Sequence, residues 1–293
     1  MIDCHTHTCF SKHAVGSIGE LVIAALAKGI RVLTVTDHAP FYVDAQNRLL
    51  ESELDRYFED IERARRDFAG RIKILRGLEF DYMPGSIDYT ERILNRYDLD
   101  FAIGSIHYVP LPGGEQVRVW DLPRLSESQV IESYFGILRD LLKCGLFDAV
   151  GHADVLLRGV PDSELARHFE TVRPLFARHG VAFELNASGL RKTTLDLQTG
   201  REVLGTWSYP SRSLLPDLIA LGTSFTVGSD AHAPADVGAG IPEIVGALVP
   251  LGLDAIRYFE QRKPVDVPVA SLAATNREQG LTKTSGERDK SVL

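Results

Sequence analysis

A chain of 293 residues can form one large α/β domain or two ordinary ones, and 44% hydrophobic with 25% charged residues is typical of a soluble globular protein. A formal net charge of −8 argues against a nucleic-acid partner, because it implies no broad basic surface. Three cysteines give no disulfide framework, so we expect a reduced, cytoplasmic setting, with neither a signal peptide nor a membrane-spanning segment.

Along the chain, short apolar runs alternate with longer helical patterns. After a first strand at the N-terminus, helical patterns over 17–28, 51–69, 88–96, 126–143, 162–179 and 211–221 alternate with buried-strand patterns over 30–36, 72–78, 101–106, 147–150, 181–186 and 223–228. Such a βα repeat indicates a mostly parallel sheet. About seven units favour a closed or nearly closed barrel over an open sheet.

The sequence contains no linker that would separate two domains, so we predict one barrel over residues 1–280. The polar segment 191–210 is predicted to be a long loop or a hairpin inserted after a strand. The stretch 281–293 is rich in Lys, Ser and Glu, and we expect it to be disordered. The sequence sets no oligomeric state.

Two histidines stand two residues apart just after the first strand, His5 and His7. Residues i and i+2 of a strand share a face, so both imidazoles would converge on one point. Similar side chains follow the other predicted strands. The full set is His5, His7 and His13; Asp37 and His38; Glu79 and Asp81; His107; His152; Glu184 and Asn186; Asp230 and His232.

The carboxyl ends of barrel strands are where catalytic groups gather, and seven of the nine histidines fall there. A single histidine at a strand end is more often structural, but seven that share this position with carboxylates indicate a metal site. Imidazole and carboxylate without thiolate suit Zn, Mn or Fe. The candidates exceed the needs of one ion, so we expect two or three divalent ions, with a carboxylate bridging two of them.

These motifs resemble those of the polymerase-and-histidinol-phosphatase (PHP) superfamily, in the family order, from residue 1 to about residue 245. They are His5-Thr-His7 with His13, Thr36-Asp-His38, Gly77-Leu-Glu79, Ser105-Ile-His107, Gly151-His152 and Ser229-Asp-Ala-His232. Three further segments resemble the histidinol-phosphate phosphatase branch: 77–85, 186–192 and 209–211. One departure is the segment 193–206, which is longer than expected for that branch.

The resemblance implies a distorted (β/α)7 TIM-like barrel with a trinuclear site at the carboxyl ends of its strands. Three ligand groups follow from it by position. His5, His7, Glu79 and Asp230 would hold the first ion; Glu79 would bridge to the second, with His107 and His152; His13, His38 and His232 would hold the third.

The resemblance also implies a metal-dependent phosphomonoesterase that converts L-histidinol phosphate to L-histidinol and inorganic phosphate in histidine biosynthesis. We expect a hydroxide held between the first two ions to attack phosphorus. The alternative is a phosphoesterase of the same family that acts on another small phosphate ester or a nucleotide. A metal-dependent amidohydrolase is a rival from another class. A structural metal protein is less favoured, because structural zinc sites are closed and rich in thiolates.

Candidate substrate-binding residues follow the same strand ends. Arg158 and Arg191 are predicted to bind phosphate, since arginine grips phosphate oxygens with a planar fork. We favour Arg191 over Lys192, because two consecutive side chains rarely reach the same target. Asp37 is a candidate proton donor or an orienting partner of a histidine. Asp81, Asp154 and Glu115 are candidates for binding the cationic amino or imidazole group of histidinol.

Overall fold

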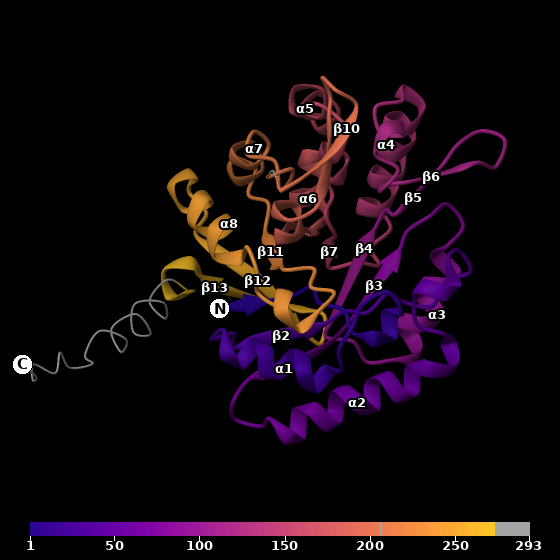
Figure 1. Cartoon of the computed structure of the whole chain (residues 1–293). Helices are drawn as coiled ribbons and strands as arrows, with labels where there is room; N and C mark the ends of the chain where they lie inside the picture. Colours follow the sequence, from indigo (N-terminus) through magenta and orange to yellow (C-terminus); the bar gives the residue numbers. More distant parts are fainter. Residues whose placement is uncertain (206, 273–293) are drawn as a thin grey trace, which may run out of the picture.

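The computed structural model describes residues 1–205 and 207–272 (Figure 1). The predicted tail 281–293 and the last residues of the predicted barrel unit 1–280 lie outside the described residues. The extent of that unit therefore stays a prediction.

Seven parallel strands form one sheet in the order β1-β2-β3-β4-β7-β8-β11. They are β1 Ile2–Asp3, β2 Val32–Val35, β3 Lys73–Asp81, β4 Phe101–Ser105, β7 Ala149–Val150, β8 Ala182–Asn186 and β11 Phe225–Gly228. The first and last strands meet, because the Cys4 N–H donates to the Val227 carbonyl at 2.9 Å and the His7 N–H to the Ala231 carbonyl at 2.8 Å. The predicted nearly closed, parallel (β/α)7 barrel is confirmed.

Helices cover the outside of the barrel, with α1 to α3 along one side and α4 to α7 along the opposite side (Figure 1). Their bounds are α1 Ile18–Ala27, α2 Leu54–Asp67, α3 Ile87–Arg96, α4 Ser128–Lys143, α5 Asp162–Phe169, α6 Arg173–His179, α7 Leu215–Ala220 and α8 Ile241–Leu248. A capping box between Ser17 and Glu20 begins α1 at the predicted place. The helix predicted over 162–179 is two helices, since Pro174 lacks an N–H and stands in the first turn of α6.

Three hairpins accompany the barrel. They are β5 Tyr108–Pro110 with β6 Gln116–Arg118, β9 Thr193–Asp196 with β10 Arg201–Leu204, and β12 Ala255–Glu260 with β13 Lys263–Pro268. The second hairpin lies in the polar segment 191–210, for which the sequence predicted either a long loop or a hairpin. Short 3-10 helices in the described residues are Cys9–Ser11, Ala45–Asn47, Glu51–Glu53, Leu122–Arg124, Val155–Arg158, Ala187–Leu190, Pro234–Asp236 and Val249–Leu251.

The stretch Pro234–Leu251 is long and apolar enough to cross a membrane by length and composition, which the sequence analysis did not anticipate. It is not one regular helix, because Gly238 and Gly240 adopt positive φ before α8 begins. On α8, Ile244 and Leu248 are fully buried in the main apolar core. The apolar composition of α8 therefore follows from its packing against the rest of the chain.

The β12–β13 hairpin closes the amino-terminal end of the barrel. An apolar layer fills the barrel there, with residues from the starts of the strands such as Ile2, Leu75 and Phe101. From the hairpin, Phe259 stacks on Phe101 with ring centroids 5.2 Å apart, and the Arg262 N–H donates to the Asp100 carbonyl at 3.0 Å. The lower half of the barrel interior is thus filled with apolar side chains, whereas the predicted metal ligands gather in the upper half.

We expect Phe259→Ala to lower the free energy of unfolding by about 3 kcal/mol, because it removes a buried ring and leaves a cavity under the site. Urea denaturation followed by circular dichroism measures this. Leu204→Ala is the matched control in another hairpin, since its side chain is 77% exposed, and should change the free energy by less than about 0.5 kcal/mol. A loss below about 1 kcal/mol for Phe259→Ala would show that the hairpin does not seal the barrel.

Candidate metal centre

The structure brings the nine predicted ligands together at the carboxyl ends of the barrel strands. In the first group, the Nε2 atoms of His5 and His7 lie 3.0 Å apart, and His7 Nε2 lies 3.3 Å from Asp230 Oδ1. His5 Nε2 lies 3.3 Å from Glu79 Oε2. Two ligands of one tetrahedral zinc ion, each about 2.0–2.1 Å from it, are themselves about 3.3 Å apart. The donor atoms of this group have that spacing.

Glu79 joins the first group to the second. Its Oε2 atom faces the pair His5 and His7, at 3.3 Å and 3.5 Å from their Nε2 atoms. Its Oε1 atom faces His152 Nε2 at 3.2 Å and His107 Nε2 at 3.5 Å, and accepts a hydrogen bond from Ser105 at 2.6 Å. One carboxylate thus presents one oxygen to each group, which is the arrangement of a bridging ligand.

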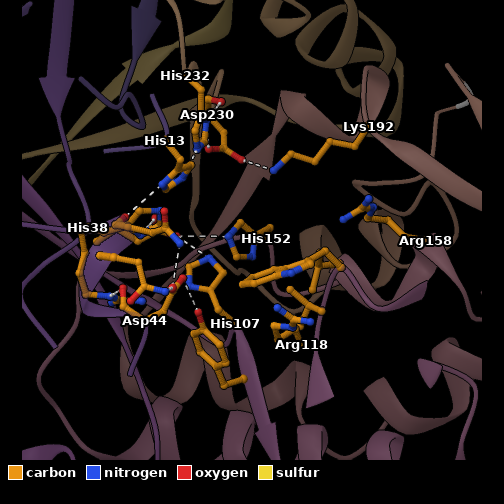
Figure 2. A pocket seen from close by; sticks show the side chains of 18 residues that line it. His13, His38, Asp44, His107, Arg118, His152, Arg158, Lys192, Asp230 and His232 are labelled. Carbon is orange, nitrogen blue, oxygen red and sulfur yellow. Dashed lines mark hydrogen bonds and ion pairs between the residues drawn. The ribbon is translucent and has the colours of Figure 1, made fainter. Parts of the chain in front are cut away.

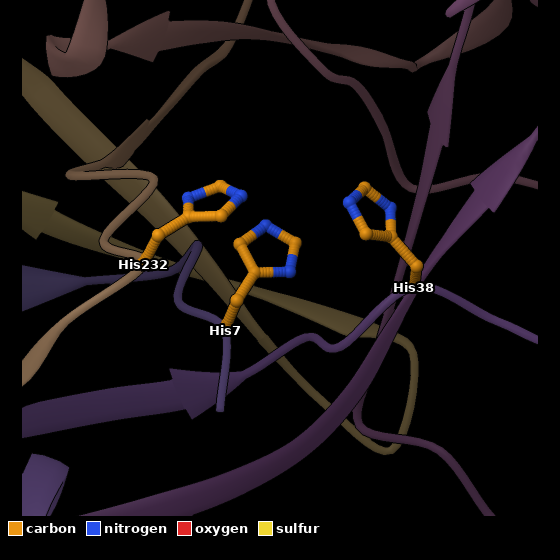
Figure 3. Close-up of side chains that lie close together, drawn as sticks. All are labelled: His7, His38 and His232. Atoms are coloured by element: carbon orange, nitrogen blue, oxygen red, sulfur yellow. The ribbon is translucent and has the colours of Figure 1, made fainter. Parts of the chain in front are cut away.

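The third group lies at the mouth. His13 Nε2 and His232 Nε2 are 3.0 Å apart, while His13 Nδ1 lies 3.0 Å from the Asn47 carbonyl and can donate to it. His38 stands between groups, because its Nδ1 atom is also 2.9 Å from Glu79 Oε2. Figure 3 shows the rings of His7 and His232 next to each other, with His38 facing them.

A set of buried partners fixes the orientation of these imidazoles. Glu184 holds His5 Nδ1 at 2.6 Å through one oxygen and accepts from the His152 backbone N–H at 2.7 Å through the other. Asp81 holds His107 Nδ1 at 2.8 Å. The two contacts to Nδ1 leave Nε2 of His5 and of His107 pointing into the cluster. Carboxylate partners select the nitrogen that binds a metal in this way.

The backbone is strained at two of the proposed ligands. His152 has φ of 29° and Asp230 has φ of 51°, in a region that side-chain-bearing residues rarely adopt. Such conformations cost on the order of 1–3 kcal/mol and persist where the surroundings enforce them, often at functional sites. The Asp230 N–H donates to the His5 carbonyl at 2.8 Å, so the first strand helps to hold this conformation.

The residues present fit bound cations. Glu79 Oε2 and His38 Nδ1 are buried and 2.9 Å apart, yet neither forms a hydrogen bond with the other or with any other described residue, so the cluster contains potential ligand atoms whose hydrogen-bonding capacity is unused. Burial lowers the pKa of His5, but Glu184, Glu79 and Asp230 together raise it well above its ordinary value. Burial would raise the pKa of Glu79, yet the surrounding imidazoles hold it well below its ordinary value. The carboxylates thus stay ionised, and the negative charge of the buried cluster favours the binding of cations.

An open pocket of about 520 Å³ leads to this cluster. Figure 2 shows Lys192 and Arg158 beside the imidazoles on one wall. Lys192 Nζ forms an ion pair with Asp230 Oδ2 at 3.0 Å, and the Arg158 Nε–H donates to the Thr193 carbonyl at 2.8 Å. Arg158 therefore lines the pocket that it was expected to reach, and Lys192, the weaker candidate of the sequence analysis, is a second cation there.

Arg191 is not among the residues that line the pocket, so the structure gives no support to the expectation that it binds phosphate. Its guanidinium donates to the carbonyls of Ala187, Ser229 and Ala239 at 2.8–3.2 Å. A 3-10 helix over 187–190 turns the chain so that Arg191 points into the neighbouring loops and Lys192 points to the pocket. Sequence adjacency could not reveal which of the two faces the site.

Four acidic candidates also lie away from the pocket lining. Asp37 is fully buried and accepts hydrogen bonds from Thr8 and Ser11, which removes it as a proton donor to a substrate and leaves it as a support for the turn after His7. Asp81 is occupied by His107 and Arg48. Asp154 is buried and accepts from the Ser211 N–H at 2.6 Å, and Glu115 is exposed and paired with Arg124.

Other residues that line the pocket escaped the sequence analysis: Asp44, Tyr108, Arg118 and Trp120. They lie on the loop after β2 and on the β5–β6 hairpin, and neither segment has a motif. The sequence analysis noted Glu184 at a strand end but gave it no role. In the structure its carboxylate lies beside His5 Nδ1 and orients that imidazole.

Comparison with known proteins identifies the family of this chain. The family model of the PHP domain matches residues 3–188. A probable histidinol-phosphatase from Deinococcus radiodurans is 31% identical over 269 residues, which cover 90% of this chain and 98% of that protein. The histidinol-phosphatase of Bacillus subtilis is 25% identical over 264 residues, which cover 80% and 95%.

Among solved structures, the fold is similar to that of histidinol phosphate phosphatase from Lactococcus lactis, which was crystallised with zinc, L-histidinol and phosphate. The TM-score is 0.72 at 21% sequence identity, over 90% of this chain and 98% of that one. At this identity the likeness shows a shared fold.

We expect Gly228→Ala to lower the affinity for metal about 10- to 100-fold, as changes to the partners of metal ligands do. A Cβ there would lie 2.3 Å from His5 Cβ and 2.6 Å from Glu184 Oε1, so the contact that orients His5 must shift. Chelator competition followed by elemental analysis measures bound metal. Gly246→Ala on α8 is the control, because a Cβ there meets no atom within 4 Å. Equal affinities in the two variants would contradict the prediction.

Proposed function

This chain belongs to the PHP domain family, and we propose that it is a histidinol-phosphatase. It would hydrolyse the phosphate monoester L-histidinol phosphate to L-histidinol and inorganic phosphate, a reaction of histidine biosynthesis. The observation that carries this proposal is the buried cluster of imidazoles and carboxylates at the base of an open pocket with cationic side chains on its wall. The relative at 31% identity, matched over nearly its whole length, supports the choice of substrate.

We assign two to three divalent ions, Zn, Mn or Fe, to the cluster. The proposed groups are His5, His7, Glu79 and Asp230; Glu79, His107 and His152; and His13, His38 and His232. Ions bound there would lower the pKa of a water molecule and offset negative charge on the phosphoryl oxygens. The nitrogen and oxygen donors, and a pocket that leaves the cluster accessible, suit a catalytic rather than a structural site.

The chain's own residues position the ester. Lys192 and Arg158 lie on the pocket wall next to Asp230 and His152, so they can donate charge-assisted hydrogen bonds to phosphoryl oxygens. Ser188 donates to Asp230 Oδ2 at 2.8 Å, as Lys192 does, which leaves Oδ1 of this carboxylate directed at His7. The phosphoryl group would therefore bind between the cationic wall and the imidazole cluster.

The protein's surroundings are inferred from its cysteines. Cys4, Cys9 and Cys144 are free, and Cys4 is buried in the lower barrel layer and Cys9 is exposed. Free thiols suit a reducing compartment, so the cytoplasm remains our expectation for this enzyme.

The direct test is phosphate release from L-histidinol phosphate, AMP, fructose bisphosphate and p-nitrophenyl phosphate, on protein of known metal content. We expect kcat/KM for L-histidinol phosphate to exceed the others by at least about 100-fold, because the pocket has to fit one small ester. Removing the ions with a chelator should abolish turnover. Comparable slow rates on all four esters, or a preference for AMP, would retain a phosphoesterase and refute the histidinol assignment.

The two adjacent cations give a sharper test of the pocket. We expect Lys192→Ala to lower kcat/KM for L-histidinol phosphate about 10- to 100-fold, because a charge-assisted hydrogen bond to phosphate is lost. Arg191→Ala should keep KM within about twofold and lower the free energy of unfolding by about 2 kcal/mol, since three loop carbonyls lose their donor. A larger rise of KM in Arg191→Ala than in Lys192→Ala would reverse this assignment.

A further inference from the structure

The carboxylates that line the pocket differ in what they face. Three acidic residues are part of the lining, and two of them, Glu79 and Asp230, face the histidine cluster. The third, Asp44, lies on the loop after β2 and is separate from the cluster (Figure 2). Neither the proposed metal sites nor the phosphate contacts use it.

Asp44 is fixed by its neighbours. Its Oδ1 atom accepts hydrogen bonds from the side-chain amides of Gln46 at 2.7 Å and Asn47 at 2.8 Å, and its Oδ2 atom accepts one from the Tyr108 hydroxyl at 2.8 Å. Its backbone is left-handed, with φ of 54° and ψ of 43°. A non-glycine residue in this conformation is held there at a cost, and such positions are enriched at binding sites.

Gln46, Asn47 and Tyr108, which donate to the side chain of Asp44, are all neutral. A carboxylate can accept about four hydrogen bonds, so Oδ2 has capacity for a further donor. The nearby Arg48 donates through Nε to the backbone carbonyl of Asp44 at 3.2 Å and pairs through Nη1 with Asp81. Its guanidinium therefore faces a different carboxylate, and the side chain of Asp44 is available to a cation from the pocket.

Charged side chains of both signs line the pocket, with Arg48 and Arg118 in addition to Lys192 and Arg158. In Figure 2, Lys192 and Arg158 lie on one side of the imidazoles, and Asp44 lies on the other. Tyr108, whose hydroxyl donates to Asp44, also packs edge-on against Trp120, with ring centroids 5.5 Å apart. Trp120 is 42% exposed, and a partly exposed indole suits a cationic or aromatic group. Outside the histidine cluster, Asp44 is the carboxylate in the lining of this pocket that can meet the cationic group of a phosphate ester.

We propose that Asp44 binds the ammonium group of the substrate and makes this pocket selective for phosphate esters that carry a cationic amine. This inference rests on the proposed function and adds the residue that distinguishes histidinol phosphate from uncharged esters. Arg118, also on the pocket wall, lies 5.8 Å from the Trp120 ring, and its repulsion would direct the ammonium group toward Asp44.

The test is Asp44→Asn, which keeps the shape and removes the charge. Steady-state kinetics would compare L-histidinol phosphate with imidazolylpropyl phosphate, the analogue that lacks the amino group. We expect kcat/KM for L-histidinol phosphate to fall about 10- to 100-fold, mainly through KM, and that for the analogue to change less than about twofold. An equal loss on both esters, or no loss on either, would overturn the inference.

Glu115→Gln is the matched control, because it also neutralises a carboxylate on this side of the molecule but one that lies outside the pocket and pairs with Arg124. It should leave the ratio of the two kcat/KM values unchanged. Bound metal, measured by elemental analysis, should be the same in both variants.

A second pair of esters, phosphoethanolamine and ethyl phosphate, separates this inference from the proposed function. If the wild-type protein prefers neither imidazole ester over p-nitrophenyl phosphate, the proposed function fails. The inference about Asp44 then stands only if Asp44→Asn lowers the preference for phosphoethanolamine over ethyl phosphate. An unchanged preference would refute it.

Discussion

A single buried carboxylate, that of Glu79, sets the constraint on which this structure depends. Its side chain is 1% exposed, and an ionised carboxylate in such surroundings costs several kcal/mol unless positive charge or donors compensate. Here its compensation comes from five imidazoles that belong to four separate segments of the chain. These segments must therefore bring their imidazoles to the same height in the barrel, around the Glu79 carboxylate. A ring of parallel strands does this, because the carboxyl ends of its strands all lie at one end of the barrel.

The upper half of the barrel can be this polar because small residues make room for it. A Cβ at Gly151 would lie 2.2 Å from Ser105 Oγ, and one at Gly77 would lie 2.7 Å from a methyl group of Thr36. Below this level the barrel is filled by apolar side chains and closed by the β12–β13 hairpin. The packed lower layer and the strained backbone at His152 and Asp230 together hold the side chains of the site in place.

The parts of the site that were predictable from the sequence are those tied to strand ends. His5, Glu79 and His107 could be placed because the carboxyl ends of the parallel strands in a βα repeat lie at the same end of the barrel. The direction of Arg191 and Lys192 could not be predicted, because a short 3-10 turn decides which of two neighbours faces the pocket. The same holds for Asp37, whose burial depends on tertiary hydrogen bonds that no local pattern encodes. The β12–β13 hairpin, which completes the barrel, carries no chemical motif either.

Chemistry and selection are therefore carried by different parts of the chain. The proposed metal ligands come mostly from strand ends that cannot move without disturbing Glu79, whereas the wall with Asp44, Tyr108 and Trp120 comes from the loop after β2 and the β5–β6 hairpin. Loops of this kind tolerate change far better than the scaffold that presents them. A change in charge on that wall can alter which ester binds while the imidazole cluster keeps its geometry. This separation explains why the cluster could be predicted from positions after strands together with a family resemblance. The proposed selection of the ester instead involves a loop whose conformation is set by contacts distant in sequence, such as that between Tyr108 and Asp44.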